Sequence, residues 1–242
     1  MAIEDLPDFI RENYEIYEWR HATAILAADF PEEWQEILDL LNSFRLYKEW
    51  IAEGGGNKTD LAGWIDHILG EKGWIETSFK TQIKVDETER DSPTHKVDCF
   101  KNRIALEVEW NNKDPFYDRD LNNFRLLFDL RVISVGVIFT RSSELQDIFK
   151  ELGRGSSYGN STTHMNKLLP RIEGGGGGGC PLLAIGIKKS LFSEDPAPAI
   201  PEKPKVKKPR KPRAKKEPAK PRAKKKPQPD KGQGLILEPE GN

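Results

Sequence analysis

Three acidic residues stand at a spacing that suits phosphodiester chemistry. Asp98 precedes Glu107 and Glu109, which lie two residues apart. In an extended strand, two residues at this spacing point to the same face. Carboxylates gathered on one patch repel each other unless a cation neutralises them. Oxygen ligands with open water positions suit Mg²⁺, and a bound divalent ion lowers the pKa of a coordinated water. The pattern therefore predicts a Mg²⁺-assisted hydrolytic site.

The elements around the acids predict how they meet. Residues 96–100 and 103–110 form a hairpin-like pair of strands around Lys101-Asn102, which brings Asp98 close to Glu107. An alternative is that Glu107 and Glu109 are the solvent-facing side of a surface strand. The nearly continuous β-branched run at 132–140 (VISVGVIFT) is typical of a strand buried on both faces, which favours a hairpin near the middle of a sheet.

Asp98, eight intervening residues and Glu107-Val108-Glu109 resemble the PD-(D/E)xK nuclease motif. Val97 replaces the usual proline, and Glu109 replaces the usual lysine, as in a subset of type II restriction endonucleases. The chain more closely resembles the BglII/BstYI family over residues 15–190, most strongly over 96–141. The similar segments are Lys96-Val-Asp-Cys-Phe, Leu106-Glu-Val-Glu-Trp-Asn-Asn, a Pro-Phe-Tyr segment and an Asn-Phe-Arg helix.

The resemblance implies roles for these residues. Asp98, Glu107 and the Val108 carbonyl would ligate Mg²⁺, and Glu109 would orient or activate the attacking water, accept a proton or bind a second ion. The implied reaction is cleavage of double-stranded DNA that leaves 5′-phosphates. Palindromic cleavage also implies a homodimer, because it needs two sites related by a two-fold axis.

Residues suited to DNA follow the acids. Asn111, Asn112 and Lys113 bring amides and a cation, groups that contact base edges and phosphates, and the resemblance places Asn112 near the bases. Arg141 and Arg154 are further candidates for phosphate contacts, with ordinary solvated charges as the alternative. Glu49 or Glu76 is a candidate for one more acid of the metal patch.

The charge divides the chain into two segments. Residues 1–195 carry 23 Lys/Arg against 34 Asp/Glu, and residues 196–242 carry 15 against 5. We therefore predict a catalytic domain over 1–195 and a Lys/Pro-rich tail over 196–242. The tail has too few apolar residues to offset the entropy of ordering and is predicted to be disordered. Its charges predict non-specific nucleic-acid binding through counterion release, with a solubilising tail as the alternative.

The order of the predicted elements and the composition indicate the fold class and the cellular location. Helices, antiparallel strands, a helix, a buried strand, a helix and a strand predict an α/β fold with a mixed sheet between helices. The resemblance implies that this sheet is restriction-endonuclease-like. The six glycines 174–179 suggest a flexible connection. No run of about 18 apolar residues or basic-apolar leader occurs, and Cys99 and Cys180 do not make a disulfide framework. These observations predict no membrane contact and a cytoplasmic, DNA-associated protein.

Two other functions share these features. The missing lysine and the basic tail are compatible with a non-catalytic DNA-binding protein on a nuclease-like scaffold. A nuclease acting on structured or RNA substrates would use the same site and differ only in substrate.

Overall fold

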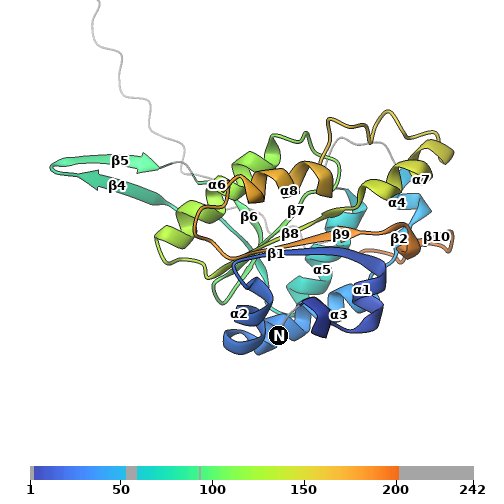
Figure 1. Ribbon diagram of the computed structural model, residues 1–242, viewed down its shortest axis with the longest axis horizontal. Coiled ribbons are helices and arrows are strands. Elements are labelled where there is room, and N and C mark those ends of the chain that lie inside the picture. Colours follow the sequence, from blue (N-terminus) through green and yellow to red (C-terminus); the bar gives the residue numbers. More distant parts are fainter. Residues whose placement is uncertain (1–2, 53–58, 93, 202–242) are drawn as a thin grey trace, which may run out of the picture. The chain divides into compact units, whose positions relative to one another are not determined.

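A six-stranded mixed sheet forms the centre of the computed structural model, which describes residues 3–52, 59–92 and 94–201 (Figure 1). The strand order is β1-β9-β8-β7-β6-β3. The pairs β7–β8 and β8–β9 are parallel, whereas the pairs at both sides of this core are antiparallel. The strands are β1 (Tyr14–Trp19), β3 (Ile75–Thr77), β6 (Val97–Lys101), β7 (Ile104–Val108), β8 (Val135–Arg141) and β9 (Leu182–Ile187).

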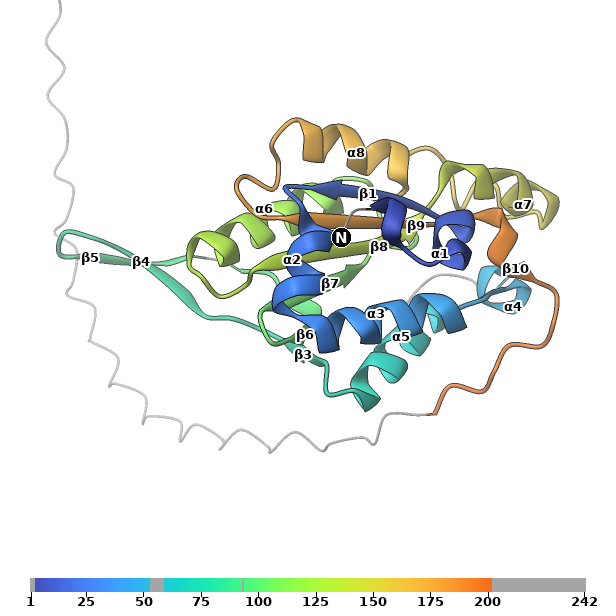
Figure 2. The same cartoon turned by 60° about the horizontal axis from the view of Figure 1, so that its bottom comes forward.

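Helices cover both faces of the sheet, as the sequence predicted (Figures 1 and 2). On one face lie α6 (Phe116–Asp129) and α8 (Met165–Glu173). On the other lie α2 (Ala22–Asp29), α3 (Pro31–Ser43) and α5 (Asp60–Glu71). Shorter helices complete the fold: α1 (Asp8–Asn13), α4 (Lys48–Ala52) and α7 (Gln146–Glu151).

The two faces of the sheet bury separate apolar clusters. Ile104, Leu106 and Val108 of β7 join the cluster beneath α3 and α5, whereas Ala105 joins the cluster beneath α6 and α8. Every residue of β8 is buried, which confirms the prediction of a strand buried on both faces. Side chains alternate along β7, so Glu107 and Glu109 share the α6 side with Ala105.

The β6–β7 turn lies at Asn102 and Arg103, which have φ values of 41° and 69°. Two consecutive residues with positive φ are the signature of the tight hairpin turn that matches strand twist. The predicted hairpin is confirmed, and its register is Cys99↔Leu106, Phe100↔Ala105 and Lys101↔Ile104.

β1 and α8 are among the elements of the fold that were not predicted. β1 was read as part of a helical first half, although Tyr14 and Ile16 alternate with Glu15 in the manner of a strand. α8 was missed because Pro170 and a glycine run follow a polar loop. The spacing of Met165, Leu168 and Ile172, all buried in the structure, is the signal that identifies α8.

The glycine run at residues 174–179 is a packed turn, contrary to the predicted flexible connection. A Cβ atom on Gly177 would lie 2.5 Å from Leu182 Cδ1, and one on Gly178 would lie 2.7 Å from the Arg125 side chain. Gly175 and Gly178 also have positive φ, which favours glycine. These glycines therefore allow the turn to pack closely against α6 and β9.

Two small sheets lie outside the central one. The hairpin of β4 (Thr81–Val85) and β5 (Thr88–Ser92) extends away from the helices and central sheet in both views (Figures 1 and 2). β10 (Phe192–Ser193) pairs in parallel with β2 (Leu46–Tyr47).

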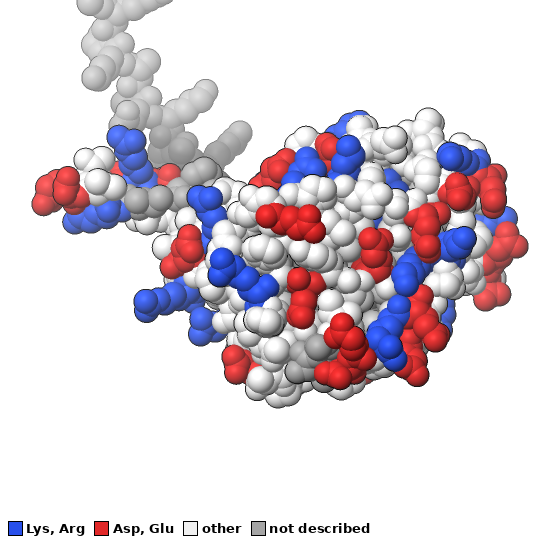
Figure 3. All heavy atoms as spheres, viewed as in Figure 1, with Lys and Arg blue, Asp and Glu red and all other residues white. Residues whose placement is uncertain are grey.

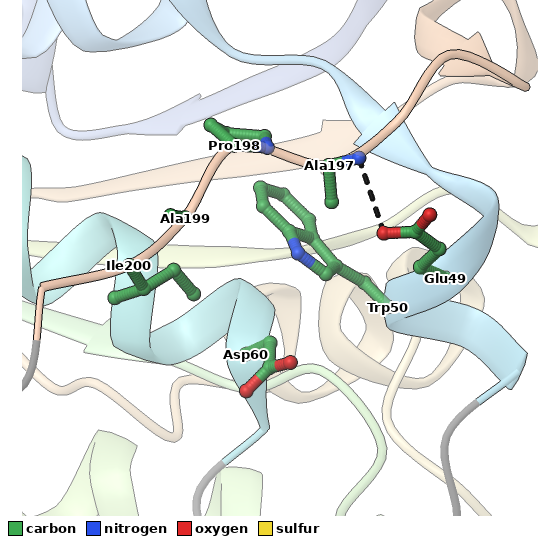
Figure 4. A pocket seen from close by; sticks show the side chains of 7 residues that line it. All are labelled: Glu49, Trp50, Asp60, Ala197, Pro198, Ala199 and Ile200. Atoms are coloured by element: carbon green, nitrogen blue, oxygen red, sulfur yellow. Dashed lines mark hydrogen bonds between the residues drawn. The ribbon is translucent and has the colours of Figure 1, made fainter.

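The segment after β10 runs along α4 and α5 and borders a pocket (Figure 4). Ala197 N donates to Glu49 Oε2 at 3.1 Å, and Ala197 packs against the core. The pocket is lined by Glu49, Trp50, Asp60 and residues 197–200. Residues 197–200 of the predicted tail therefore lie against the folded core. The part of the predicted disordered tail from residue 202 onward lies outside the described residues. The domain boundary at 195 stays a prediction.

Both cysteines, Cys99 and Cys180, are buried and unoxidised. Among the residues that the structure describes, no helix combines the length and the apolar character that a membrane span requires.

Candidate functional site

Asp98 and Glu107 lie opposite each other on β6 and β7, as predicted. The regular ladder ends at Cys99↔Leu106, and the next position in this register sets Asp98 against Glu107. Each carboxylate there accepts a bond from the other strand. Asp98 N donates to Glu107 Oε2 at 3.3 Å, and Val108 N donates to Asp98 Oδ2 at 3.1 Å. At this position, the side-chain carboxylates of Asp98 and Glu107 accept the hydrogen bonds between β6 and β7 that backbone carbonyls accept in a regular ladder.

Burial excludes the alternative that Glu107 and Glu109 form the wet face of a surface strand. Only 1% of Glu107 and 2% of Glu109 is exposed. Ionised carboxylates are almost never fully buried unless they are paired or bind a cation. No donor among the described residues reaches Glu107 Oε1, so one carboxylate oxygen of this pair is buried without a partner.

Glu109 is held by both neighbouring elements. Asn112 Nδ2 donates to its Oε2 at 2.8 Å, and Arg119 Nη2 donates to its Oε1 at 3.1 Å. Its backbone continues the sheet, because Glu109 N donates to Phe139 O and Thr140 Oγ1 donates to Glu109 O at 2.7 Å. The β7 end, the following loop and α6 together fix this carboxyl group.

A fourth acid, Asp120 of α6, belongs to the same group and was not predicted. Asp120 is completely buried, and Arg119 Nε donates to its Oδ1 at 2.8 Å. The signal was present in the sequence. Tyr117, Leu121 and Phe124 form the apolar stripe of α6, and Asp120 interrupts that stripe. An acid inside an apolar helical stripe indicates either a buried ion pair or a functional site.

Glu107, Glu109 and Asp120 have the electrostatics of crowded buried carboxyl groups. Burial, followed by repulsion from Asp120 and Asp98, raises the pKa of Glu107 well above its usual value. Burial and repulsion from Asp120 raise the pKa of Glu109 to about 9. Burial also raises the pKa of Asp120. Glu109 therefore holds a proton at neutral pH unless positive charge is brought to the group.

His95 lies at the border of this group. The side chain of Asn123 in α6 holds the His95 backbone through two hydrogen bonds of 3.2 Å. His95 N donates to Asn123 Oδ1, and Asn123 Nδ2 donates to His95 O. Burial and the Arg119 charge lower the pKa of His95, against smaller opposite effects of Asp120 and Asp98. His95 is thus neutral near pH 7 and adds no positive charge to the acids.

The loop after β7 carries three of the residues predicted to contact DNA. Lys113 is exposed, whereas Asn111 and Asn112 are half-buried. A second loop, residues 153–164, supports this one. Thr163 N donates to Asn112 O at 2.9 Å, and Lys113 forms an isolated bridge with Thr162. The two polar loops therefore lie side by side.

Arg141 differs from its prediction as an accessible phosphate contact, because the side chain is buried and only 1% exposed. Its Nη2 donates to Tyr158 O at 3.0 Å and to Thr162 Oγ1 at 2.8 Å. The guanidinium carbon lies 5.1 Å from the Phe149 ring centroid and 5.8 Å from that of Tyr158. In this conformation Arg141 anchors the 153–164 loop. Arg154, the other predicted arginine, is half-buried in the same loop.

The two additional acids considered from the first half of the chain have other partners. Glu49 accepts from Ala197 at the α4 pocket (Figure 4). Glu76 of β3 forms an ion pair of 2.5 Å with Lys96.

The donor set fits a hard divalent cation by its chemistry. The group contains four carboxyl groups and one guanidinium, that of Arg119, which contacts Glu109 and Asp120. Glu107 Oε1 and Asp120 Oδ2 are buried oxygens to which no donor among the described residues is bonded. Mg²⁺ prefers such oxygen ligands. The acids are not already arranged as ligands: within residues 3–52, 59–92 and 94–201, no group of three His, Cys, Asp or Glu side chains has metal-binding geometry.

Comparison with known protein families identifies the relationship of the chain. The family model described as restriction endonuclease BglII/BglIII matches residues 14–187. This range begins at the first residue of β1 and ends at the last residue of β9. No curated protein matches the chain.

Proposed function

The chain belongs to the BglII/BglIII restriction endonuclease family, and from this premise we propose that it is a Mg²⁺-dependent type II endonuclease that cleaves double-stranded DNA and leaves 5′-phosphates. The observation that carries the proposal is the juxtaposition of Asp98 with the buried Glu107, with the buried Glu109 two residues further along the chain. Repulsion among these carboxylates makes the site a receptor for positive charge.

Asp98 and Glu107 hold the cation in this proposal, with the Val108 carbonyl as a further ligand. Each acid offers a second oxygen beyond the one bonded to the facing strand. When bound, Mg²⁺ lowers the pKa of a coordinated water and stabilises charge that develops on the phosphoryl group. The two backbone bonds keep both carboxylates on the same edge of the β6–β7 hairpin before any ligand arrives.

Glu109 acts as the proton acceptor for the attacking water. Without added positive charge it holds a proton, because its pKa is raised. Positive charge at the group lowers this pKa and frees the carboxylate to accept a proton from water. Asn112 and Arg119 orient it through bonds to its two oxygens. A lysine at this position could not accept a proton, so this chain relies on a carboxylate where the usual motif has a cation.

DNA contact is assigned to the two loops beside the acids. Asn111, Asn112 and Lys113 approach bases and phosphates directly in this proposal, and Arg154 contacts a phosphate from the second loop. Arg141 acts through the loop that it anchors. Because Asn112 also donates to Glu109, base contact and the proton acceptor share one side chain.

The test is cleavage of a supercoiled plasmid in Mg²⁺, with EDTA as the metal-free control. Wild type is expected to produce linear DNA whose ends are 5′-phosphorylated. Asp98→Asn and Glu107→Gln, which keep side-chain size, are expected to lower the rate by about a hundredfold or more, because each removes a ligand charge. Glu151→Gln on the exposed end of α7 is the matched control and retains the wild-type rate. Full activity in either site variant contradicts the assignment.

A homodimer is part of this proposal, because cutting both strands of a palindrome requires two symmetric sites. Sedimentation of the full chain with a short duplex tests it. Two chains per duplex is the expected result, and one chain per duplex on a cleaved substrate contradicts the symmetric arrangement.

The replacement of the usual lysine by Glu109, together with the absence of a ready metal geometry in the described residues, gives a second candidate: a non-catalytic DNA-binding protein on this scaffold. It predicts DNA binding with steep salt dependence and no Mg²⁺-stimulated strand breakage. The plasmid experiment separates the two candidates directly. Single-stranded and structured RNA substrates in the same assay test whether DNA is the substrate.

A further inference from the structure

Asp120 carries an inference that goes beyond the three acids of the sequence motif. It lies in the first half of α6, on the helix face that packs against the sheet, and is completely buried. Its Oδ1 accepts from Arg119 Nε, but no donor among the described residues reaches its Oδ2. A buried carboxylate oxygen without a donor costs free energy unless a proton or a cation occupies the space beside it.

The unsatisfied oxygen belongs to the acid group of β7. Asp120 is the largest source of charge repulsion on both Glu107 and Glu109. The Asp120 and Glu109 carboxyl groups are also within hydrogen-bonding reach of each other. Two ionised carboxylates have only acceptors, so their contact requires either a shared proton or a cation between them.

The Arg119 guanidinium does not neutralise both carboxylates. Arg119 contacts both Glu109 Oε1 and Asp120 Oδ1, so it neutralises one charge of the pair. Its guanidinium also lies 4.3 Å from the centroid of the Phe116 ring, and its side chain is 32% exposed, which places it at the outer side of the group. Glu107 Oε1 and Asp120 Oδ2 remain without donors on the buried side.

We propose that Asp120 is a further ligand of the cation site, and that Asp120 and Glu109 form a second divalent-cation position beside the one held by Asp98 and Glu107. With this position filled, Glu109 acts as a ligand and not as the proton acceptor. The inference rests on the proposed function, because it extends the same site. Its ligands come from α6 and the end of β7, whereas those of the first position come from β6 and β7. All four are carboxylates, which selects Mg²⁺ or Mn²⁺ over softer metals.

The experiment counts Mn²⁺ ions bound to the full chain without DNA, from the loss of the free Mn²⁺ signal in electron paramagnetic resonance. Wild type is expected to bind two ions per chain. Asp120→Asn, which keeps the bond from Arg119, is expected to bind one ion at unchanged affinity and the second at least tenfold more weakly. Asp118→Asn is the matched control, because Asp118 is an exposed acid of the same helix that pairs with Arg171.

Two further measurements keep the proposal falsifiable. Thermal unfolding in EDTA is expected to show that Asp120→Asn is at least as stable as wild type, because a repelling buried charge is removed. If that variant does not fold, Asp120→Ser replaces it. Two ions at wild-type affinity in a folded Asp120 variant overturn the proposal and leave Asp120 as an acid that shares a proton with Glu109.

Plasmid cleavage separates this inference from the function it rests on. Wild-type protein that binds two Mn²⁺ ions and does not cleave DNA contradicts the proposed function and leaves the second position standing. Wild-type protein that cleaves DNA and binds one ion contradicts only the second position.

Discussion

At the scale of single residues, the crowded carboxyl groups connect stability to pH. Glu109 has a folded-state pKa of about 9 and an ordinary value of 4.5. Below pH 4.5 both states hold the proton, and the group does not affect stability. Between these values the unfolded chain releases the proton that the folded chain keeps, so the free energy of unfolding falls by up to about 1.4 kcal/mol per pH unit.

The corresponding prediction is that Glu109→Gln stabilises the metal-free protein at pH 8 by a few kcal/mol and has little effect at pH 4.5. Urea unfolding in EDTA at four pH values measures the difference between variant and wild type. Glu151→Gln, an exposed change on α7, is expected to give no pH-dependent difference. A difference that stays constant from pH 4.5 to 8 would contradict the raised pKa of Glu109.

Arg141 allows a prediction that separates shape from charge. Its two bonds from Nη2 and its position beside the Phe149 and Tyr158 rings require the planar guanidinium. A lysine keeps the charge but not the fork of donors. Arg141→Lys is therefore expected to cost about 1–3 kcal/mol of unfolding free energy.

Hydrogen exchange measures where that loss falls. Relative to wild type, we expect faster amide exchange in residues 153–164, which Arg141 anchors. Exchange in β1, at the edge of the sheet, is expected to be unchanged. Arg131→Lys, at an exposed position in the turn after α6, serves as the control for the substitution itself. Slower or equal exchange in the loop would show that its order does not depend on Arg141.

At the scale of elements, the glycine turn at 174–179 gives a prediction with a matched control. Gly177→Ala places a Cβ 2.5 Å from Leu182 Cδ1 in β9, and overpacking of this kind costs about 1–3 kcal/mol. Gly70→Ala makes the same substitution inside α5, where no atom lies within 4 Å, and is expected to stabilise by about 0.5–1 kcal/mol. Opposite signs in thermal unfolding confirm the packed turn, whereas equal effects indicate the flexible connection that composition suggested.

The elements also show which signals in the sequence were sufficient. The β6–β7 hairpin and β8 were predictable because local alternation and a β-branched run are properties of the segment itself. The meeting of Asp98 with Glu107 followed from hairpin register, a short-range constraint. Glycine composition could not distinguish a linker from a turn, since that depends on Leu182 and Arg125 elsewhere in the chain.

Long-range contacts account for the parts of the site that the sequence did not provide. Asp120 reaches Glu109 only because α6 packs back over β7, and spacing along the chain does not encode that packing. Arg141 looked like an accessible cation because its burial depends on Phe149 and Tyr158 of a later segment. Motif spacing was therefore sufficient to identify Asp98, Glu107 and Glu109. Asp120 and the burial of Arg141 depend on tertiary packing, which motif spacing does not reveal.

At the scale of the whole molecule, charge is divided between the two parts of the chain. Residues 1–195 have a net charge of −11, and residues 196–242 have +10. On the face that Figure 3 shows, acidic and basic side chains lie next to one another, and no extended basic surface is visible. A domain with this net charge repels DNA at long range, and we predict that the attraction comes from the basic segment.

We therefore predict that a chain ending at Glu202 binds DNA more weakly but still cleaves it at saturating DNA. Each phosphate neutralised by the tail contributes about −0.9 to the slope of log K against log salt. Loss of about five such contacts would reduce that slope by roughly 4 to 5. We expect KM to rise at low salt, with kcat within about twofold of wild type, because the acids and both loops lie before residue 202.

A second variant separates charge from chain length: the full chain with the 15 Lys and Arg of residues 196–242 replaced by Gln. It is expected to match the truncated chain in both slope and KM, since counterion release depends on charge alone. A Gln tail that binds like wild type would mean that the segment acts through length or specific contacts. A folded truncated chain that has lost cleavage at saturating DNA would mean that the tail takes part in the reaction, because long-range attraction no longer limits the rate once the DNA is bound.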